Sequence, residues 1–128
     1  MQKDWKDILT KEEFIVCRKK GTEPAFSGSY DKFYEEGIYY CKCCEIQLFN
    51  SKDKFNSGSG WPSYTEPSHE ENIKYITDDS YNMSRVEVQC SKCESHLGHV
   101  FNDGPKPKNK RYCINSLSLT FKKIITHK

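Results

Sequence analysis

Long apolar runs are missing from this sequence of 128 residues. No stretch approaches the ~20 consecutive apolar residues that a membrane-spanning helix needs, and the first residues lack the apolar run of a secretory leader. Apolar residues make up only 35% of the chain, while charged residues reach 30%. These shortages predict a cytoplasmic protein that does not enter a membrane, with a modest core that benefits from a staple.

A strong excess of one charge is absent as well. The formal net charge is only +2, and the basic residues are spread along the chain. Charge therefore gives no support to nucleic-acid binding, which usually needs a basic patch or stripe. Internal repeats, low-complexity tracts and linker-like segments are also missing, so we expect a single domain over residues 1–128 that acts as a monomer.

The hydrophobic pattern predicts a mainly β, largely antiparallel domain behind an N-terminal helical arm of about residues 1–21. Residues 4–21 have helical character, with Thr10 and Glu13 placed as a capping box and Gly21 as the residue that stops the helix. The expected strands are Ile38–Tyr40 and Ile46–Phe49 as a hairpin, Ile73–Ile76, Arg85–Cys90 with a half-buried alternation, Leu97–Phe101, and the alternating segment Tyr112–Phe121.

Cysteine, by contrast, is abundant, with seven in the chain. In a reducing compartment, so many cysteines indicate metal binding or redox catalysis rather than structural disulfides. Cys41-x-x-Cys44 and Cys90-x-x-Cys93 are two knuckles of equal spacing, and four thiolates suit tetrahedral Zn²⁺. Four unmetallated cysteines or one redox pair are the alternatives, and the matched spacing favours metal. We therefore predict one structural zinc that clips two distant hairpins together.

Cys113 is the candidate nucleophile among the three remaining cysteines. On a strand, Arg111, Cys113 and Asn115 share one face, and a nearby guanidinium favours the thiolate. The alternative is a small buried cysteine, which is the commoner role of a free thiol. His96 and His99 could each act as a general acid near neutral pH or bind metal. Because four thiolates already satisfy zinc, we favour the proton donor.

Trp61 lies in the segment Gly58–Ser63, which two glycines and a proline keep irregular. An indole on a constrained loop can form an apolar wall for a ligand methyl group. The alternative is a tryptophan folded onto the core, which is common. Composition does not decide between the two.

Four separated segments carry a recognisable pattern: Gly21–Gly28 (GTEPAFSG), Ser57–Ser63 (SGSGWPS), His96–Pro105 (HLGHVFNDGP) and Arg111–Ser116 (RYCINS). Together with both knuckles, they closely resemble the methionine-R-sulfoxide reductases, the B type, over roughly residues 7–121. The resemblance implies a compact fold of two antiparallel β sheets, with a structural zinc remote from catalysis.

The same resemblance implies roles for individual residues. Cys113 corresponds to the catalytic nucleophile, and Trp61 to the residue that receives the substrate's methyl group. The implied substrate is the R epimer of methionine sulfoxide, mainly within proteins, because each epimer has its own enzyme. Thioredoxin or a similar thiol is the implied reductant. Polar residues of the family's active site correspond to His96, His99, Asp103, Arg111 and Asn115.

The predicted reaction begins with attack of the Cys113 thiolate on the sulfoxide sulfur. His99 or His96 supplies a proton to the oxygen as the S–O bond weakens, Arg111 stabilises the thiolate, and Asp103 orients a histidine. Methionine leaves, and Cys113 remains as a sulfenic acid.

The sequence departs from the family pattern in three places. Ser59 stands where many members carry the resolving cysteine, Glu45 replaces a common glycine, and the loop Lys106–Lys110 has no aromatic residue. Because Ser59 cannot form a disulfide, we expect one of two recycling routes. Either Cys17, on an arm that zinc does not tie down, resolves the sulfenic acid, or an external thiol reduces it directly.

A second functional hypothesis is a zinc-clipped β module that binds a protein partner without redox chemistry, since a fold does not fix a function. The knuckles fit both hypotheses equally. Cys113 with Arg111 and two histidines favours the reductase, because a binding module has no need of an activated thiol.

Overall fold

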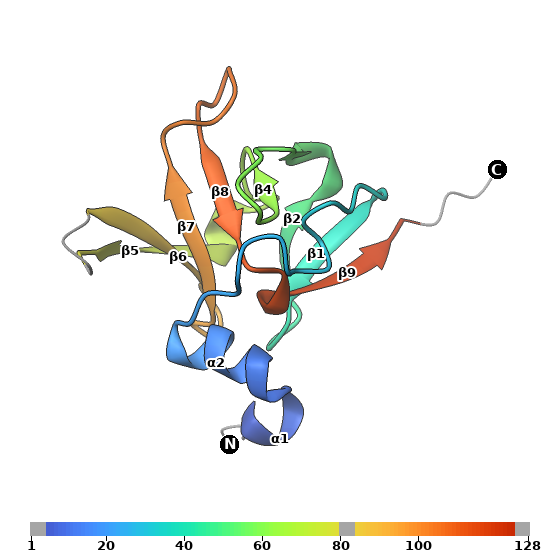
Figure 1. Cartoon of the computed structure of the whole chain (residues 1–128), viewed down its shortest axis with the longest axis vertical. Helices are drawn as coiled ribbons and strands as arrows, with labels where there is room; N and C mark the ends of the chain where they lie inside the picture. Colours follow the sequence, from blue (N-terminus) through green and yellow to red (C-terminus); the bar gives the residue numbers. More distant parts are fainter. Residues whose placement is uncertain (1–4, 80–83, 125–128) are drawn as a thin grey trace.

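Two antiparallel sheets form the body of the molecule, and a short helical arm covers one end (Figure 1). The structure, a computed structural model, describes residues 5–79 and 84–124. The mainly β fold with two antiparallel sheets confirms the prediction from the sequence. The helical elements are α1 Trp5–Ile8 and α2 Lys11–Lys19, with the 3₁₀ turns η1 Ser51–Asp53, η2 Glu70–Asn72 and η4 Ser116–Ser118.

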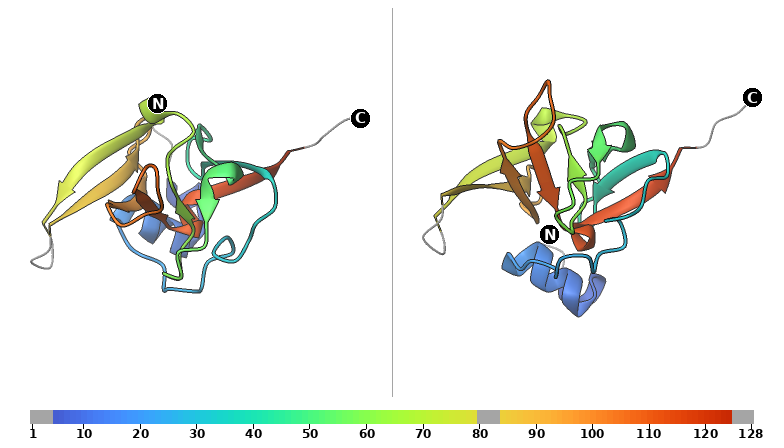
Figure 2. Two further views of the ribbon diagram at one scale, coloured as in Figure 1. Left: turned by 90° about the horizontal axis from the view of Figure 1, so that it is seen from above. Right: turned by 45° about the horizontal axis from the view of Figure 1, so that its top comes forward.

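The sheets differ in size and extend in different directions. The β5–β6 hairpin of the larger sheet and the β1–β9 pair of the smaller one lie on opposite sides of the molecule in each view (Figures 1 and 2). The smaller sheet has the order β2 (Gln47–Asn50), β1 (Gly37–Cys41), β9 (Leu119–Lys123). The larger has the order β3 (Lys54–Phe55), β4 (Ser63–Tyr64), β8 (Arg111–Ile114), β7 (His96–Phe101), β6 (Arg85–Cys90), β5 (Ile73–Asp78).

The segment Tyr112–Phe121, expected to alternate as one strand, is divided between the two sheets. β8 ends at Ile114, the η4 turn follows, and β9 then pairs with β1. The single-strand expectation is wrong because side chains of the turn bond elsewhere: the Ser118 hydroxyl donates to the His96 carbonyl at 2.8 Å. The turn therefore carries the chain from the strand of Cys113 to the other sheet.

The helical arm expected over residues 4–21 is made of two short helices. Thr10 interrupts it and caps α2: its hydroxyl accepts from the Glu13 N–H at 3.1 Å, and the Glu13 carboxylate accepts from the Thr10 N–H at 2.9 Å. This confirms the capping box. The left-handed residue that ends α2 is Lys20 (φ 59°), and not Gly21. The N–H groups of both residues donate to the Ile15 carbonyl.

β6 is buried on both faces toward its end, instead of alternating as the sequence suggested. Glu87, Val88, Gln89 and Cys90 are all buried. The end of the arm accounts for the polar pair, because Lys20 Nζ lies 3.3 Å from the Glu87 carboxylate. The polar residues Glu87 and Gln89, which the alternation assigned to a solvent-facing side, thus lie on a covered face next to β7.

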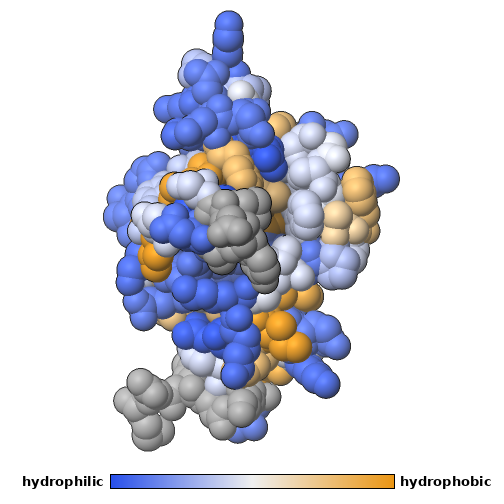
Figure 3. All heavy atoms as spheres, turned by 60° about the vertical axis from the view of Figure 1, so that its left-hand side comes forward, coloured by the Kyte–Doolittle hydropathy of each residue, from blue (hydrophilic) through white to orange (hydrophobic). Residues whose placement is uncertain are grey.

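Aromatic rings fill the core between the sheets. Tyr39, Phe49 and Tyr64 are fully buried, and the Phe49 and Tyr64 rings stack at 4.4 Å. The surface has a different character: seen from the side of the β5–β6 hairpin, apolar residues appear in small areas among hydrophilic ones (Figure 3). Within the described residues, no helix has the length and apolar character that crossing a bilayer requires.

Candidate active site and metal centre

The four knuckle cysteines converge on one point. The sulfur atoms of Cys41, Cys44, Cys90 and Cys93 all lie within 4.8 Å of one another. Across the two knuckles, Cys41 Sγ is 3.6 Å from Cys93 Sγ, and Cys44 Sγ is 3.4 Å from Cys90 Sγ. A tetrahedral zinc with ~2.3 Å bonds separates its sulfur ligands by about 3.8 Å. The donor set and its spacing therefore fit a zinc ion.

Both knuckles have the same backbone geometry. In each, the residue after the second cysteine donates its N–H to the carbonyl of the first cysteine at 2.9 Å: Glu45 to Cys41, and Glu94 to Cys90. Both glutamates are left-handed, with φ of 65° and 64°. Glycine adopts this conformation most easily. Glu45, which stands where the family commonly has glycine, therefore takes a backbone conformation that its side chain disfavours. The fifth thiol of the region, Cys43, points to the Ser95 hydroxyl at 3.8 Å.

Cys113 lies at the centre of the larger sheet and opens into a cavity of about 250 Å³. On β8 it pairs with Ser63 of β4 on one side and with His99 of β7 on the other. Residues from both neighbouring segments therefore surround one sulfur. The cavity is lined by Thr22, Ser59, Trp61, Arg85, Gly98, His99, Phe101, Arg111, Cys113, Ile114 and Asn115.

The environment of the Cys113 thiol pulls its pKa in two directions. Burial raises the pKa, while the Ser59 hydroxyl, 4.0 Å away, and the Arg111 guanidinium lower it. Burial is the larger effect, so the pKa lies above its usual range. The expected influence of Arg111 is present, but it does not by itself make an acidic thiol in the free protein.

Asp103 holds Arg111 rather than a histidine, which corrects the sequence-based hypothesis. Its carboxylate accepts two hydrogen bonds from the guanidinium, at 2.9 and 3.1 Å. The guanidinium also stacks over the Phe101 ring at 4.4 Å. Since Arg111 precedes Cys113 by two residues on one strand, these contacts fix its charge at the rim of the cavity.

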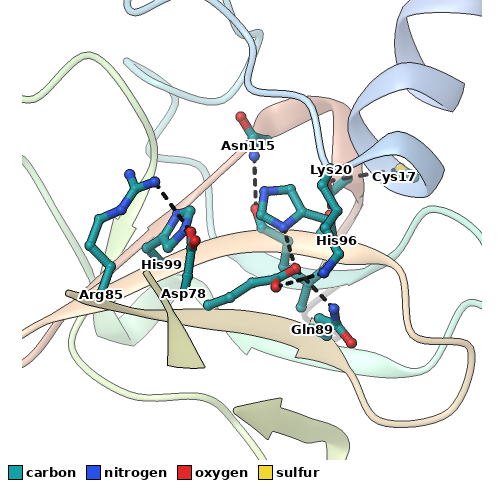
Figure 4. Close-up of polar contacts among 11 residues, drawn as sticks. Cys17, Lys20, Asp78, Arg85, Gln89, His96, His99 and Asn115 are labelled. Carbon is teal, nitrogen blue, oxygen red and sulfur yellow. Dashed lines mark hydrogen bonds and ion pairs between the residues drawn. The ribbon is translucent and has the colours of Figure 1, made fainter. Parts of the chain in front are cut away.

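His99 has a different carboxylate partner, which the sequence reasoning missed. Its Nε2 lies 2.7 Å from Asp78 Oδ2, and Arg85 Nη2 donates to the same oxygen at 3.2 Å (Figure 4). Asp78 and Arg85 face each other in the register of the β5–β6 hairpin. The strand expected from the sequence ends at Ile76, short of Asp78, and periodicity does not report the register that places Asp78 opposite Arg85.

His96 lies one step further from Cys113. Its Nδ1 is 2.7 Å from the Glu87 carboxylate, and its Nε2 is buried without a hydrogen-bond partner among the described residues. It lines a second hollow, of about 510 Å³, whereas His99 lines both this hollow and the Cys113 cavity. Burial lowers the pKa of His96. Of the two histidines, it is His99 that lines the Cys113 cavity and pairs with Cys113 across the sheet.

Trp61 and Asn115 both line the cavity, and both are held in place from behind. The Trp61 indole N–H donates to the Glu23 carbonyl at 2.9 Å. The Asn115 amide accepts from the Glu23 N–H at 3.0 Å and donates to the Leu97 carbonyl at 3.1 Å. The Asn115 side chain is thus buried and bonded to the protein, although it also lines the cavity.

Cys17 does not reach the cavity in this structure. It is 2% exposed and lies between α2 and η4, where its sulfur contacts the Leu117 carbonyl at 3.7 Å and the Ser118 hydroxyl at 3.9 Å (Figure 4). At this residue the arm is packed and not free, because α2 buries its inner face against the turn after β8.

Comparison with known proteins is consistent with this geometry. The SelR domain model matches residues 9–123. The peptide methionine sulfoxide reductase MsrB of Pseudomonas aeruginosa is 53% identical over 115 residues, which cover 90% of this chain and 87% of that protein. The protein of the same name from Methanosarcina mazei is 52% identical over 122 residues, covering 95% and 87%.

The fold alone is shared more widely. The crystal structure of the Mis18 "Yippee-like" domain superposes with a TM-score of 0.57 at 16% identity, and covers 72% of this chain and all of that one. At so low an identity, the likeness concerns the architecture. The family model and the close relatives span nearly the whole chain, and the chain belongs to the SelR domain family, that of the peptide methionine sulfoxide reductases MsrB.

Proposed function

We propose that this protein reduces methionine (R)-sulfoxide in proteins to methionine, with Cys113 as the nucleophile. The observation that carries the proposal is the convergence of Trp61, His99 and Arg111 on the one thiol that opens into the cavity. Membership of the family supports the reaction class. Trp61 offers an apolar wall to the substrate's methyl group, and the polar side of the cavity receives the sulfoxide oxygen.

The Cys113 thiolate attacks the sulfoxide sulfur, and its electron pair forms the new bond to the substrate. The oxygen takes up a proton from His99, which Asp78 holds in position. The bond between the substrate sulfur and this oxygen then breaks as the oxygen is transferred to the Cys113 sulfur, and the new S–S bond breaks with its electron pair passing to the substrate sulfur. Methionine leaves with its sulfur reduced, and Cys113 is left as a sulfenic acid. Arg111 and Ser59 stabilise the thiolate before the attack, offsetting part of the cost of burial.

Recycling is proposed to use an external thiol directly, of the thioredoxin type. Among the described residues, Cys113 is the one thiol that lines the cavity, and the hydroxyl of Ser59 lies 4.0 Å from its sulfur. One external thiol displaces water from the sulfenic acid and forms a mixed disulfide. A second thiol then releases Cys113, and the reductant leaves as its own disulfide.

The four knuckle cysteines are proposed to hold one structural zinc. Cys41, Cys44, Cys90 and Cys93 join the β1–β2 hairpin to the β6–β7 hairpin, and β7 carries His99. When bound, the metal supplies folding energy and no step of the chemistry. A zinc-clipped binding module without redox activity is not favoured, because the chain matches nearly the full length of close relatives that are named as reductases.

The decisive experiment is incubation with resolved R and S epimers of a methionine sulfoxide peptide, with dithiothreitol as the reductant. We expect methionine to form from the R epimer alone. Cys113→Ser, checked for fold and metal content, is the matched control and should form none. Equal turnover of both epimers, or none by the folded wild-type protein, contradicts the proposal.

A further inference from the structure

Glu23 is a buried acid at the back of the Cys113 site that the proposed reaction does not use. It lies in the segment Gly21–Gly28, after the helical arm, and is only 2% exposed. Burial raises the pKa of its carboxyl group. A carboxyl group kept from water is costly unless something is gained from its placement, so its contacts indicate what it does.

The backbone of Glu23 holds two residues of the cavity at once. Its carbonyl accepts the Trp61 indole N–H at 2.9 Å, and its N–H donates to Asn115 Oδ1 at 3.0 Å. Asn115 in turn bonds the Leu97 carbonyl on β7 at 3.1 Å. The apolar wall and the polar end of the cavity therefore share one attachment point.

The side chain of Glu23 fixes where that backbone lies. Oε1 accepts the N–H of Leu117 at 2.9 Å, in the η4 turn that follows the strand of Cys113. The other oxygen lies against Gly28, where an added Cβ would come within 2.2 Å of Oε2 and of the Ser116 hydroxyl. The site thus depends on the length of the carboxylate side chain, and on the space that a glycine leaves for it.

We propose that Glu23 is a positioning residue for the reductase: by holding Leu117, it sets the distance between Trp61 and Asn115 and hence the fit of the cavity to the substrate's methyl group. The kinetic part of this inference rests on the proposed function. It does not rest on contact between Glu23 and the substrate, because the carboxylate faces η4 and Gly28, on the far side of its own backbone.

Two substitutions separate reach from charge. Glu23→Asp keeps the charge but is one methylene too short to hold the Leu117 N–H, whereas Glu23→Gln keeps an acceptor of the same reach without the charge. Glu13→Gln is the matched control, because Glu13 lines the same hollow as Glu23 and its capping role tolerates Gln. A second way to displace the carboxylate is Gly28→Ala.

The readouts are KM and kcat for the R sulfoxide peptide, and the fluorescence of Trp61 in a Trp5→Phe background, since the chain has two tryptophans. For Glu23→Asp, we expect KM to rise roughly ten- to a hundredfold, the cost of a cavity wall displaced by about 1 Å, with kcat little changed. The Trp61 emission should shift to the red as water reaches the indole. Gly28→Ala should behave alike, while Glu13→Gln should resemble the parent protein and Glu23→Gln should keep the parent KM and emission. The lost charge in Glu23→Gln acts on Cys113, because the Glu23 carboxylate raises the pKa of that thiol, and its effect is therefore read in kcat and not in KM.

Zinc content and thermal unfolding identify variants that have kept the fold. The proposal is overturned if folded Glu23→Asp or Gly28→Ala shows the parent KM and the parent emission. A red shift and raised KM in Glu23→Gln would overturn it too, because charge and not reach would then be responsible. If the parent protein itself reduces no sulfoxide, the proposed function fails, while the emission of Trp61 still decides the positioning role.

Discussion

Cysteine side chains have opposite surroundings in two regions of the molecule. One is the cluster of Cys41, Cys44, Cys90 and Cys93 (the clip), and the other is the cavity of Cys113. In the clip, four cysteine sulfurs lie within 4.8 Å of one another, held by two backbone turns of one geometry. In the cavity, the sulfur of Cys113 stands apart from other thiols and faces Arg111, Ser59 and an opening of about 250 Å³. Crowding of thiols suits a shared cation, whereas isolation beside a donor and an opening suits attack on a substrate.

The difference also decides what each region needs from the rest of the fold. A knuckle is complete within five residues, so its geometry follows from a short stretch of sequence. The cavity takes its residues from β6, β7, β8 and the loops around them, and its supports from β5 and the segment after the arm. Substitutions should therefore affect the two regions in different ways, and the largest effects should separate them.

The largest effect is expected in the clip. Cys44→Ser removes one of four ligands, and we expect loss of bound zinc and destabilisation of roughly 5 kcal/mol or more, because metal binding energy in such sites is folding energy. Activity disappears with the fold. Metal analysis and thermal unfolding measure this. Cys43→Ser is the matched control, since Cys43 lies in the same knuckle but outside the cluster of four sulfurs, and it should keep the zinc; a stable, active Cys44→Ser protein would contradict the assignment.

The second largest effect is expected at the nucleophile. Cys113→Ser should lower turnover by at least about a thousandfold, since a serine hydroxyl is scarcely ionised at neutral pH, while zinc content and unfolding temperature stay near those of the parent. Cys17→Ser, assayed with an external thiol, should retain turnover, because Cys17 lies under α2 and away from the cavity. Loss of multiple turnover in folded Cys17→Ser would restore the resolving role that the sequence suggested.

Weakening the contact between His99 and the carboxylate that holds it should have a smaller effect on turnover. Asp78→Asn weakens the contact to His99 Nε2, and we expect kcat to fall about ten- to a hundredfold with KM little changed, as for a general acid held less well. Glu94→Gln removes an exposed carboxylate paired with Lys74 and should leave the kinetics unchanged. A parent-like kcat in Asp78→Asn would mean that the proton comes from elsewhere.

Thiol ionisation gives a pH-dependent test of the cavity. Burial raises the pKa of Cys113, so its alkylation rate should climb about tenfold per pH unit through neutral pH and level off above the ordinary thiol value of ~8.5. With a raised folded-state pKa, the stability gained from the protonated thiol is present below ~8.5 and lost as pH rises through the folded value. Alkylation mapped by peptide mass, at several pH values, checks the first effect; a midpoint at or below ~8.5 contradicts it.

The sequence predicted the parts of the site that are set locally. Both knuckles, the capping box at Thr10 and the exposed face of Cys113 depend on spacings of two or three residues, and those spacings survive folding. For Trp61 and the two histidines, which the sequence offered with alternatives, the resemblance to the reductases favoured the roles in the active site. Two sheets were implied in the same way, and the strand order confirms them.

The parts that were missed depend on pairing between distant segments. Asp78 reaches His99 because β5 and β6 pair with Asp78 opposite Arg85, and Glu87 reaches His96 from the neighbouring strand. Glu23 matters because a turn nearly a hundred residues away donates to it. Periodicity reports which face a residue occupies but not which neighbour it meets, so the carboxylate partners could not be assigned from the sequence.

The smallest effect is expected at Asp103, where the sequence and the structure disagree most plainly. Its side chain is 63% exposed and pairs with Arg111, and exposed ion pairs contribute about 0–1 kcal/mol. Asp103→Asn keeps one acceptor for the guanidinium, so kcat/KM should fall only about two- to fivefold, mainly through a less well fixed Arg111 beside Cys113. Steady-state kinetics on the R sulfoxide peptide measure this. A fall above about a hundredfold would instead match the loss of a general acid, and would mean that Asp103 turns to a histidine during the reaction.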